Sequence, residues 1–228
     1  MTRNITLVRP SYQVFNLIFG GVESLKKVSD HWQQALTASA DGVSLFSEFE
    51  TRAKNAAAEV FRVKTAAEAT EVITSLVKYT NARKIVAVNS PLQQAAGINA
   101  ALAELGVALY TDQADIAEHA ESADIGISSV EFGIAESGSV CQDAMAFESR
   151  LVSMLPPVHV AFMNSGRVVP GVTEAMEVIS KVYDRGYISF ITGPSRTADI
   201  ERVLTIGVHG PSRFIIIAVD EEVNGGNC

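Results

Sequence analysis

The sequence predicts an α/β fold in which helices flank a mostly parallel, Rossmann-like sheet. Apolar runs of strand length recur along the chain, and the runs at 85–88, 125–128 and 214–219 are typical of strands buried on both faces. Segments with helical periodicity lie between such runs. Strands that alternate with helices in this way form parallel sheets with right-handed crossovers.

The first half of the chain supplies most of these elements. Residues 25–36 keep a helical spacing, and a second helix is expected from about Ser44. Thr65 and Glu68 have the spacing of a capping box, which predicts that a third helix begins there. The other elements expected in this half are, in order, a strand at 60–63, a strand at 85–88 that ends at Asn89-Ser90-Pro91, a helix reaching about 105, a strand at 107–110, a helix around 116–119 and a strand at 125–128.

The pattern changes after Ser129. Three β-like runs at 133–140, 151–155 and 158–163 follow without a helix-length pattern between them, which predicts a small antiparallel excursion beside the parallel sheet. The last expected elements are a helix at 172–182, a strand at 187–192, a short helix around 200–204 and a strand at 214–219.

Composition limits the classes of function. The chain has 228 residues and no composition break, and we divide it into an N-terminal helical segment (1–43) and one α/β domain (44–228). A net charge of −8 argues against binding to nucleic acid or to acidic membrane surfaces. No signal peptide or membrane-spanning run is evident, so we expect a cytoplasmic protein.

The cysteine count argues against a redox cofactor on this chain. An iron–sulfur cluster needs four thiolates, or two thiolates with two histidines, and the chain has only two cysteines, Cys141 and Cys228. Neither common glycine-rich nucleotide loop is present. No ligand pair has a spacing that indicates a metal site. We therefore expect no cofactor and no metal on this chain.

The strongest candidate for ligand binding is the turn that contains Gly193, Ser195, Arg196 and Thr197. It lies between an expected strand and an expected helix, where free N–H groups and the helix dipole favour an anion. The hydroxyls would add donors, and Arg196 would add a fixed positive charge. The alternative is a tight turn whose hydroxyls cap the next helix while Arg196 pairs with Asp199.

A second candidate is the turn formed by Glu136, Ser137, Gly138 and Ser139. Glycine permits a sharp turn there, and the carboxylate could project into a cleft. The alternative is a simple hairpin in which Glu136 pairs with an arginine.

Three further residues are candidates because of their chemistry. His159 and His209 suit general acid–base catalysis, since histidine titrates near neutrality. Arg150 precedes an apolar run and could bind a carboxylate bidentately. Each of the three could equally be structural. Cys141 is expected to be a packed residue rather than a nucleophile.

Four segments carry a family resemblance: GIAESGSV, SRLVSMLPPVHV, GPSRTADIE and LTIGVHGP. In this order they resemble the lactate-utilisation protein C family, which contains the LUD domain, over roughly Asp124 to Asp220. The resemblance implies the fold shared by sugar-phosphate isomerases, glucosamine-phosphate deaminases and coenzyme A transferases. It also implies that His159, His209 and Arg150 lie in family motifs, and that Glu136 could match the glutamate nucleophile of the transferases. The family commonly has threonine where Ser137 and Ser139 stand.

The resemblance implies a role in lactate utilisation. Members accompany iron–sulfur proteins in the oxidation of lactate to pyruvate, so the clusters are expected on partner proteins. We expect this chain to be a cluster-free subunit that binds a small anionic ligand between the 136–139 turn and the Arg196 turn. The alternatives are an independent isomerase or coenzyme A transferase-like enzyme and a non-catalytic binding or scaffold subunit. A homo-oligomer is compatible with each.

Overall fold

A six-stranded parallel sheet forms the centre of the molecule. In this computed structural model the described residues are 25–26, 42–197 and 205–223. The strands follow the order β2-β14-β8-β5-β3-β4, and every neighbouring pair runs parallel. Their bounds are β2 (Glu59–Val63), β3 (Lys84–Ala87), β4 (Ala108–Tyr110), β5 (Ile125–Ser129), β8 (Val158–Asn164) and β14 (Arg213–Val219). The predicted α/β fold with a mostly parallel sheet is confirmed.

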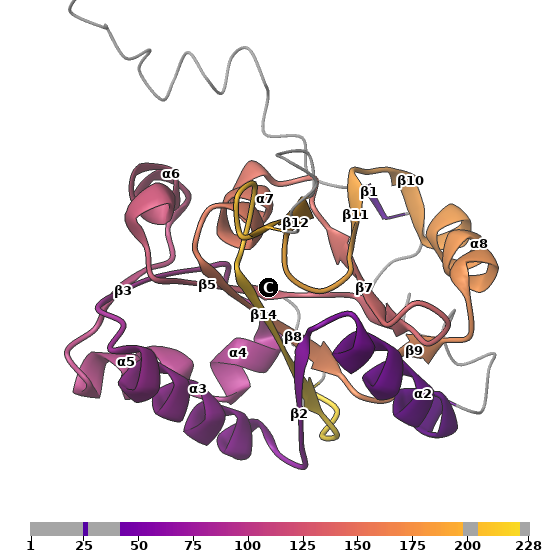
Figure 1. Ribbon diagram of the computed structural model, residues 1–228, viewed down its shortest axis with the longest axis horizontal. Coiled ribbons are helices and arrows are strands. Elements are labelled where there is room, and N and C mark those ends of the chain that lie inside the picture. The colour runs from indigo at the N-terminus through magenta and orange to yellow at the C-terminus, as the bar shows by residue number, and fades with distance from the viewer. Residues whose placement is uncertain (1–24, 27–41, 198–204, 224–228) are drawn as a thin grey trace, which may run out of the picture.

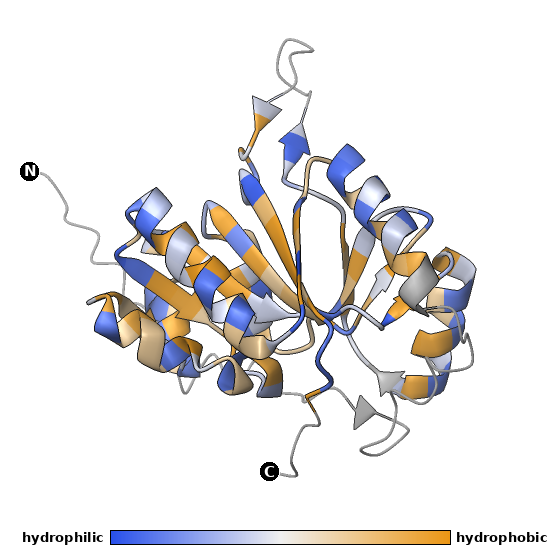
Figure 2. Ribbon diagram, turned by 90° about the horizontal axis from the view of Figure 1, so that it is seen from below, coloured by the Kyte–Doolittle hydropathy of each residue, from blue (hydrophilic) through white to orange (hydrophobic). Residues whose placement is uncertain are grey.

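Helices cover both faces of this sheet (Figure 1). One face carries α3 (Ala66–Thr80), α4 (Pro91–Ala95) and α5 (Ile98–Glu104), and the other carries α2 (Gly42–Asn55), α6 (Gln113–His119) with the 3₁₀ turn η2 (Ala120–Ser122), and α7 (Phe147–Met154). Successive side chains of a strand point to opposite faces, so Ile215 of β14 belongs to the first core and Ile216 to the second. Figure 2 shows the same arrangement as hydrophobic strands between helices whose outer faces are hydrophilic.

The sequence signals for α2 and α3 are confirmed. The Thr65 hydroxyl accepts a hydrogen bond from the Glu68 N–H group at 3.2 Å, which caps α3. Asn81 ends the helix in the left-handed conformation. In α2 the expected apolar face is buried, with Phe46 and Phe49 in the core.

The expected antiparallel excursion is a second sheet of four strands in the order β11-β7-β6-β9. Its strands are β6 (Phe132–Ile134), β7 (Ser139–Asp143), β9 (Val168–Val169) and β11 (Ile188–Ile191). β7 pairs antiparallel with both β6 and β11, while β9 is parallel to β6. Helix α8 (Val172–Val182) packs on this sheet through Ala175, Val178 and Val182.

Three expectations for individual elements were wrong. Residues 151–155 are not a strand, because Leu151 to Met154 form the second half of α7. The apolar run at 187–192 does not enter the parallel sheet, since β11 pairs antiparallel with β7. The single helix expected to end near Leu105 is two helices, α4 and α5, which are separated at Gly97 in the left-handed conformation.

Parts of the prediction fall on segments outside the described residues. These include most of the expected helix at 25–36 and the short helix expected around 200–204. Of the first of these, Leu25 and Lys26 form a short strand, β1, which pairs with β10 (Tyr183–Arg185). In the described part of the chain, none of the helices has both the length and the apolarity needed to cross a bilayer.

Candidate functional site

The order of the strands creates a topological switch point between β3 and β5. From β3 the chain moves outward to β4, returns to β5, and then continues on the other side through β8 and β14. The connections that leave neighbouring strands at such a point diverge, and open α/β sheets bind ligands in the resulting crevice at the carboxyl ends of the strands.

A cavity of about 300 Å³ lies at this point, and we call it the crevice. Its walls come from the residues that follow β3, from the end of β5, and from the loop of residues 144–146 between β7 and α7, which we call the roof loop. The crevice is lined by Val88, Asn89, Ser90, Ser128, Ser129, Glu131, Asp143, Met145, Ala146 and Ser149. Most of these side chains carry a hydroxyl, amide or carboxylate group, so the lining can make many hydrogen bonds.

Two serines join the walls of the crevice. The Ser129 hydroxyl at the end of β5 donates a hydrogen bond to Ser90 Oγ, at a distance of 2.6 Å. Ser90 also accepts a bond from the Gln93 N–H group at 3.2 Å, which caps α4. This pair therefore fixes the loop after β3 against the end of β5.

The floor of the crevice is a buried polar network centred on Ser128. Ser128 Oγ lies 2.8 Å from Nε2 of His159 and accepts a bond of 3.0 Å from Nε2 of Gln142. His159 is fully buried in β8, and its ring stacks on Phe214 with 5.2 Å between ring centroids. Its Nδ1 has no hydrogen-bond partner among the described residues.

The Ser128–His159 pair is suited to binding rather than to nucleophilic attack. Burial lowers the pKa of His159 to about 3, so the ring is neutral and is a weak base. A serine nucleophile needs a base that accepts its proton near neutral pH and a third group that orients the base. His159 therefore holds Ser128 in place and does not activate it.

Two carboxylates complete the polar lining. One oxygen of Asp143 accepts the Met145 N–H group at 3.1 Å, which shapes the roof loop. Burial, together with the influence of Glu131 and other nearby acidic groups, raises the pKa of Tyr183. Burial and the same acidic residues also raise the pKa of Cys141, so its thiol stays protonated and is not a nucleophile. The described residues contain no cluster of three or more histidine, cysteine or acidic side chains that could hold a metal ion.

Arg150, a predicted ligand residue, lies beside the crevice and holds its roof. One guanidinium nitrogen donates to the carbonyl oxygens of Ala144 and Met145 at 2.5 and 2.9 Å. The guanidinium also lies over the ring of Tyr187, 5.3 Å from its centroid. Arg150 is thus a positioning residue for the roof loop.

The predicted turn at Glu136 lies outside the crevice. Glu136 is exposed, and its carboxylate accepts the N–H group of Val172 at 3.2 Å, at the start of α8. Ser139 shares a hydrogen bond of 2.6 Å with Thr192. Gly138 packs closely against the backbone of α2. Ser137 Oγ is buried without a hydrogen-bond partner in the described structure.

The predicted Arg196 turn (residues 193–197) follows β11, which ends at Ile191. Gly193 has a φ of 66° and packs against Ala56, just beyond the end of α2. Ser195 bonds through its backbone to Pro211 and Gly207, and Arg196 and Thr197 form β12 (Arg196–Thr197), which pairs antiparallel with β13 (Thr205–Ile206). The turn therefore does not lie at the carboxyl edge of the parallel sheet, because β11 belongs to the second sheet.

The structure places the two predicted turns near each other but does not pair their charged groups. The Ser139 hydroxyl bonds to the hydroxyl of Thr192, which directly precedes the second turn. Arg196 and His209 are both exposed. Over the described residues, the structure contains no hydrogen bond or ion pair between the side chains of Glu136 and Arg196. Of the three predicted catalytic residues, only His159 contacts the crevice lining, through Ser128.

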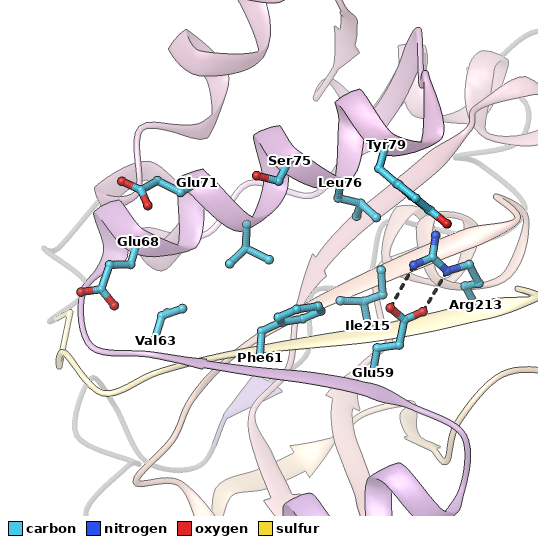
Figure 3. A pocket seen from close by; sticks show the side chains of 11 residues that line it. Glu59, Phe61, Val63, Glu68, Glu71, Ser75, Leu76, Tyr79, Arg213 and Ile215 are labelled. Atoms are coloured by element: carbon cyan, nitrogen blue, oxygen red, sulfur yellow. Dashed lines mark hydrogen bonds and ion pairs between the residues drawn. The ribbon is translucent and has the colours of Figure 1, made fainter.

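A larger groove of about 630 Å³ lies on the open edge of the sheet, between β2 and α3 (Figure 3). Phe61, Leu76 and Ile215 give it an apolar surface. One end carries the two-bonded ion pair between Arg213 and Glu59, with N–O distances of 2.8 and 2.9 Å. Glu68 and Glu71 lie toward the opposite end (Figure 3). The hydroxyl groups of the groove, on Ser75 and Tyr79, belong to exposed side chains of one helix, α3. Those of the crevice converge from several elements, so we place the candidate functional site at the crevice.

Comparison with known proteins identifies the family. The family model of the LUD domain matches residues 46–219. The chain belongs to the LUD-domain family. A lactate utilization protein C of Anoxybacillus flavithermus is 32% identical over 157 residues, which is 68% of this chain and 71% of that protein. The protein of that name from Halalkalibacterium halodurans is 32% identical over 66% of this chain and 69% of its own length.

Two further matches differ in how much of the chain they cover. A lactate utilization protein C of Geobacillus is 38% identical over 109 residues, which cover 46% of this chain and 45% of that protein. The crystal structure of a DUF162 family protein from Deinococcus radiodurans superposes with a TM-score of 0.54 at 22% identity, covering 78% of this chain and 98% of that one. At this identity the structural likeness supports a shared fold alone.

Proposed function

We propose that this LUD-domain protein serves in bacterial lactate utilisation and uses the crevice between β3 and β5 as its ligand site. The observation that carries the role is the 32% identity to a lactate utilization protein C over 68% of the chain. The place of the ligand site is supported by the switch point and by the polar lining of the crevice.

The protein acts in the cytoplasm as a cluster-free subunit in this proposal, and iron–sulfur partner proteins oxidise lactate to pyruvate. The cysteine inventory supports this division of roles, because the chain has two cysteines and Cys141 is buried with a raised pKa. A small anion is assigned to the Arg196 turn, away from the crevice. The exposed guanidinium of Arg196 and the nearby hydroxyl of half-buried Ser195 support this second assignment.

Deletion of the gene in its host tests the role directly. The deletion strain is expected to grow normally on glucose and to grow poorly with L-lactate as the sole carbon source, and a plasmid copy of the gene is expected to restore growth. Normal growth of the deletion strain on L-lactate would contradict the proposed role.

A further inference from the structure

The buried network around Ser128 uses its oxygen as an acceptor and leaves its hydroxyl proton available to a ligand. His159 is neutral, so one ring nitrogen carries a hydrogen and the other is an acceptor. Nδ1 has no hydrogen-bond partner among the described residues, and a buried N–H without a partner is rarer than a buried acceptor without one. We therefore place the hydrogen on Nε2, which donates to Ser128 Oγ.

With this assignment Ser128 Oγ accepts two hydrogen bonds, one from His159 and one from Gln142. Both lone pairs are then occupied, so the remaining direction around the oxygen holds its own proton. Since Ser128 lines the crevice, we infer that the partner of this proton is a ligand in the cavity.

Ser90 has the same pattern on the opposite wall. Its oxygen accepts bonds from the Ser129 hydroxyl and from the Gln93 N–H group. Its own proton is likewise left for a partner in the crevice, which Ser90 also lines. The crevice thus offers two hydroxyl donors whose directions are fixed before a ligand binds.

The negative charge of the lining also limits which ligands can bind, because it disfavours anions. Glu131 and Asp143 are acidic, and none of the described residues that line the crevice is a lysine, arginine or histidine. Two arginines lie nearby: Arg150 bonds to the roof-loop carbonyls, and Arg167 interacts electrostatically with Glu131. Neither lines the cavity, so an anion held by the two serines would lie next to the two carboxylates and would be repelled. A carboxylate has about four acceptor positions, so the bond to Met145 does not by itself prevent Asp143 from accepting a hydroxyl group of a ligand.

We propose that the crevice binds an uncharged polyhydroxy compound of the sugar or polyol type, with Ser90 and Ser128 as hydroxyl donors and Asp143 as an acceptor. The proposal rests on the proposed use of the crevice as the ligand site. It separates two ligands: the neutral compound binds in the crevice, and the small anion binds at the Arg196 turn.

Titration of the ¹⁵N-labelled full chain by NMR tests the proposal, with D-ribose as the neutral probe and L-lactate and inorganic phosphate as anionic probes. D-Ribose is expected to shift the amide signals of crevice residues such as Asn89 and Ser129, and the anions are expected to leave them in place. Ser128→Ala is expected to weaken ribose binding about tenfold, because a buried donor is lost. Ser75→Ala, at an exposed helix position away from the crevice, is the matched control and is expected to bind like the parent.

Ser90→Ala is the second variant, since Ser90 lies outside the buried network and its replacement leaves His159 and Gln142 paired. Three results would overturn the proposal: no crevice shift with D-ribose, larger crevice shifts with L-lactate or phosphate, or parent-like ribose affinity in both serine variants. None of these results bears on growth on L-lactate, so a failure of the ligand class is distinguishable from a failure of the proposed function.

Discussion

Ser128 Oγ lies 2.8 Å from Nε2 of His159, and this bond links the floor of the crevice to a fully buried side chain in the central strand β8. Because the ring is also stacked on Phe214, its position is fixed by the core of the sheet. The geometry of the crevice floor therefore depends on the ionisation state of a core residue.

The first prediction concerns this ionisation. Burial lowers the pKa of His159 to about 3, against an ordinary value of 6.5. Between these pH values the unfolded chain binds a proton that the folded chain does not, so the free energy of unfolding falls as the pH decreases from 6.5. Above about pH 7.5 the residue contributes almost no pH dependence.

Urea denaturation followed by circular dichroism should show that the free energy of unfolding falls by about 2 kcal/mol between pH 7.5 and pH 5 because of His159. His159→Gln is expected to remove this part of the dependence of the free energy of unfolding on pH. His209→Gln, at an exposed position, is expected to retain it. Equal slopes in His159→Gln and the parent would show that the histidine does not titrate as described.

The second prediction concerns Gly193, which anchors the Arg196 turn. Its φ is 66°, and a Cβ added there would collide with the backbone oxygen of Ala56. Gly193→Ala is expected to lower the free energy of unfolding by about 3 kcal/mol or more, because the left-handed conformation and the collision both destabilise the folded state. Gly97 has the same φ of 66° with no atom within 4 Å of an added Cβ, so Gly97→Ala is the matched control and is expected to cost about 1 kcal/mol. Thermal or urea unfolding that gave both variants the same loss would contradict the close packing at Ala56.

The third prediction concerns anion binding at the Arg196 turn. Charge-assisted hydrogen bonds contribute about 1.5–3 kcal/mol each, so Arg196→Ala is expected to weaken phosphate or sulfate binding by roughly tenfold or more. The fold is expected to stay intact, because Arg196 is exposed. Calorimetry on Arg196→Ala, with Arg83→Ala as an exposed arginine control, measures this difference. Equal anion affinity in the parent and in Arg196→Ala would exclude Arg196 as the partner of the anion.

The fourth prediction concerns redox chemistry. With two cysteines in the chain, the purified protein is expected to be colourless and to leave lactate unoxidised when no partner protein is added. An absorption spectrum and a lactate-dependent dye-reduction assay check both parts. Stoichiometric absorbance from a cluster or flavin, or dye reduction by this chain alone, would refute it.

The fold was predictable because its signals are local. Alternating apolar runs and helical faces, such as the one capped by Thr65, placed most elements of the parallel sheet. The errors came from segments whose partners are distant in sequence. Phe190 is half exposed and its strand is antiparallel. A short apolar run in the sequence does not indicate which sheet the strand joins. Helix α7 buries Ser149, Val152 and Ser153, and small polar residues on a buried face make the helical period difficult to detect in the sequence.

The candidate site was less predictable, since it depends on the order of strands. Asn89-Ser90 follows one buried strand and Ser128-Ser129 ends another, which is the local signal that could have identified them. Their approach requires β3 and β5 to be neighbours, although β4 lies between them in the chain. Asp143 is the last residue of β7, which belongs to the second sheet. By contrast, the Arg196 turn was prominent because of its sequence motif, and its expected place at the edge of the parallel sheet depended on the misassigned strand β11.

Complementation of the deletion strain tests most directly whether the crevice is the working site in lactate utilisation. Growth on L-lactate would be measured with plasmids encoding the parent, the double variant Ser90→Ala/Ser128→Ala, or the control Ser75→Ala, after equal amounts of folded protein are confirmed. The parent and Ser75→Ala are expected to restore growth, and the double variant is expected to fail. Full restoration by the double variant would contradict the account.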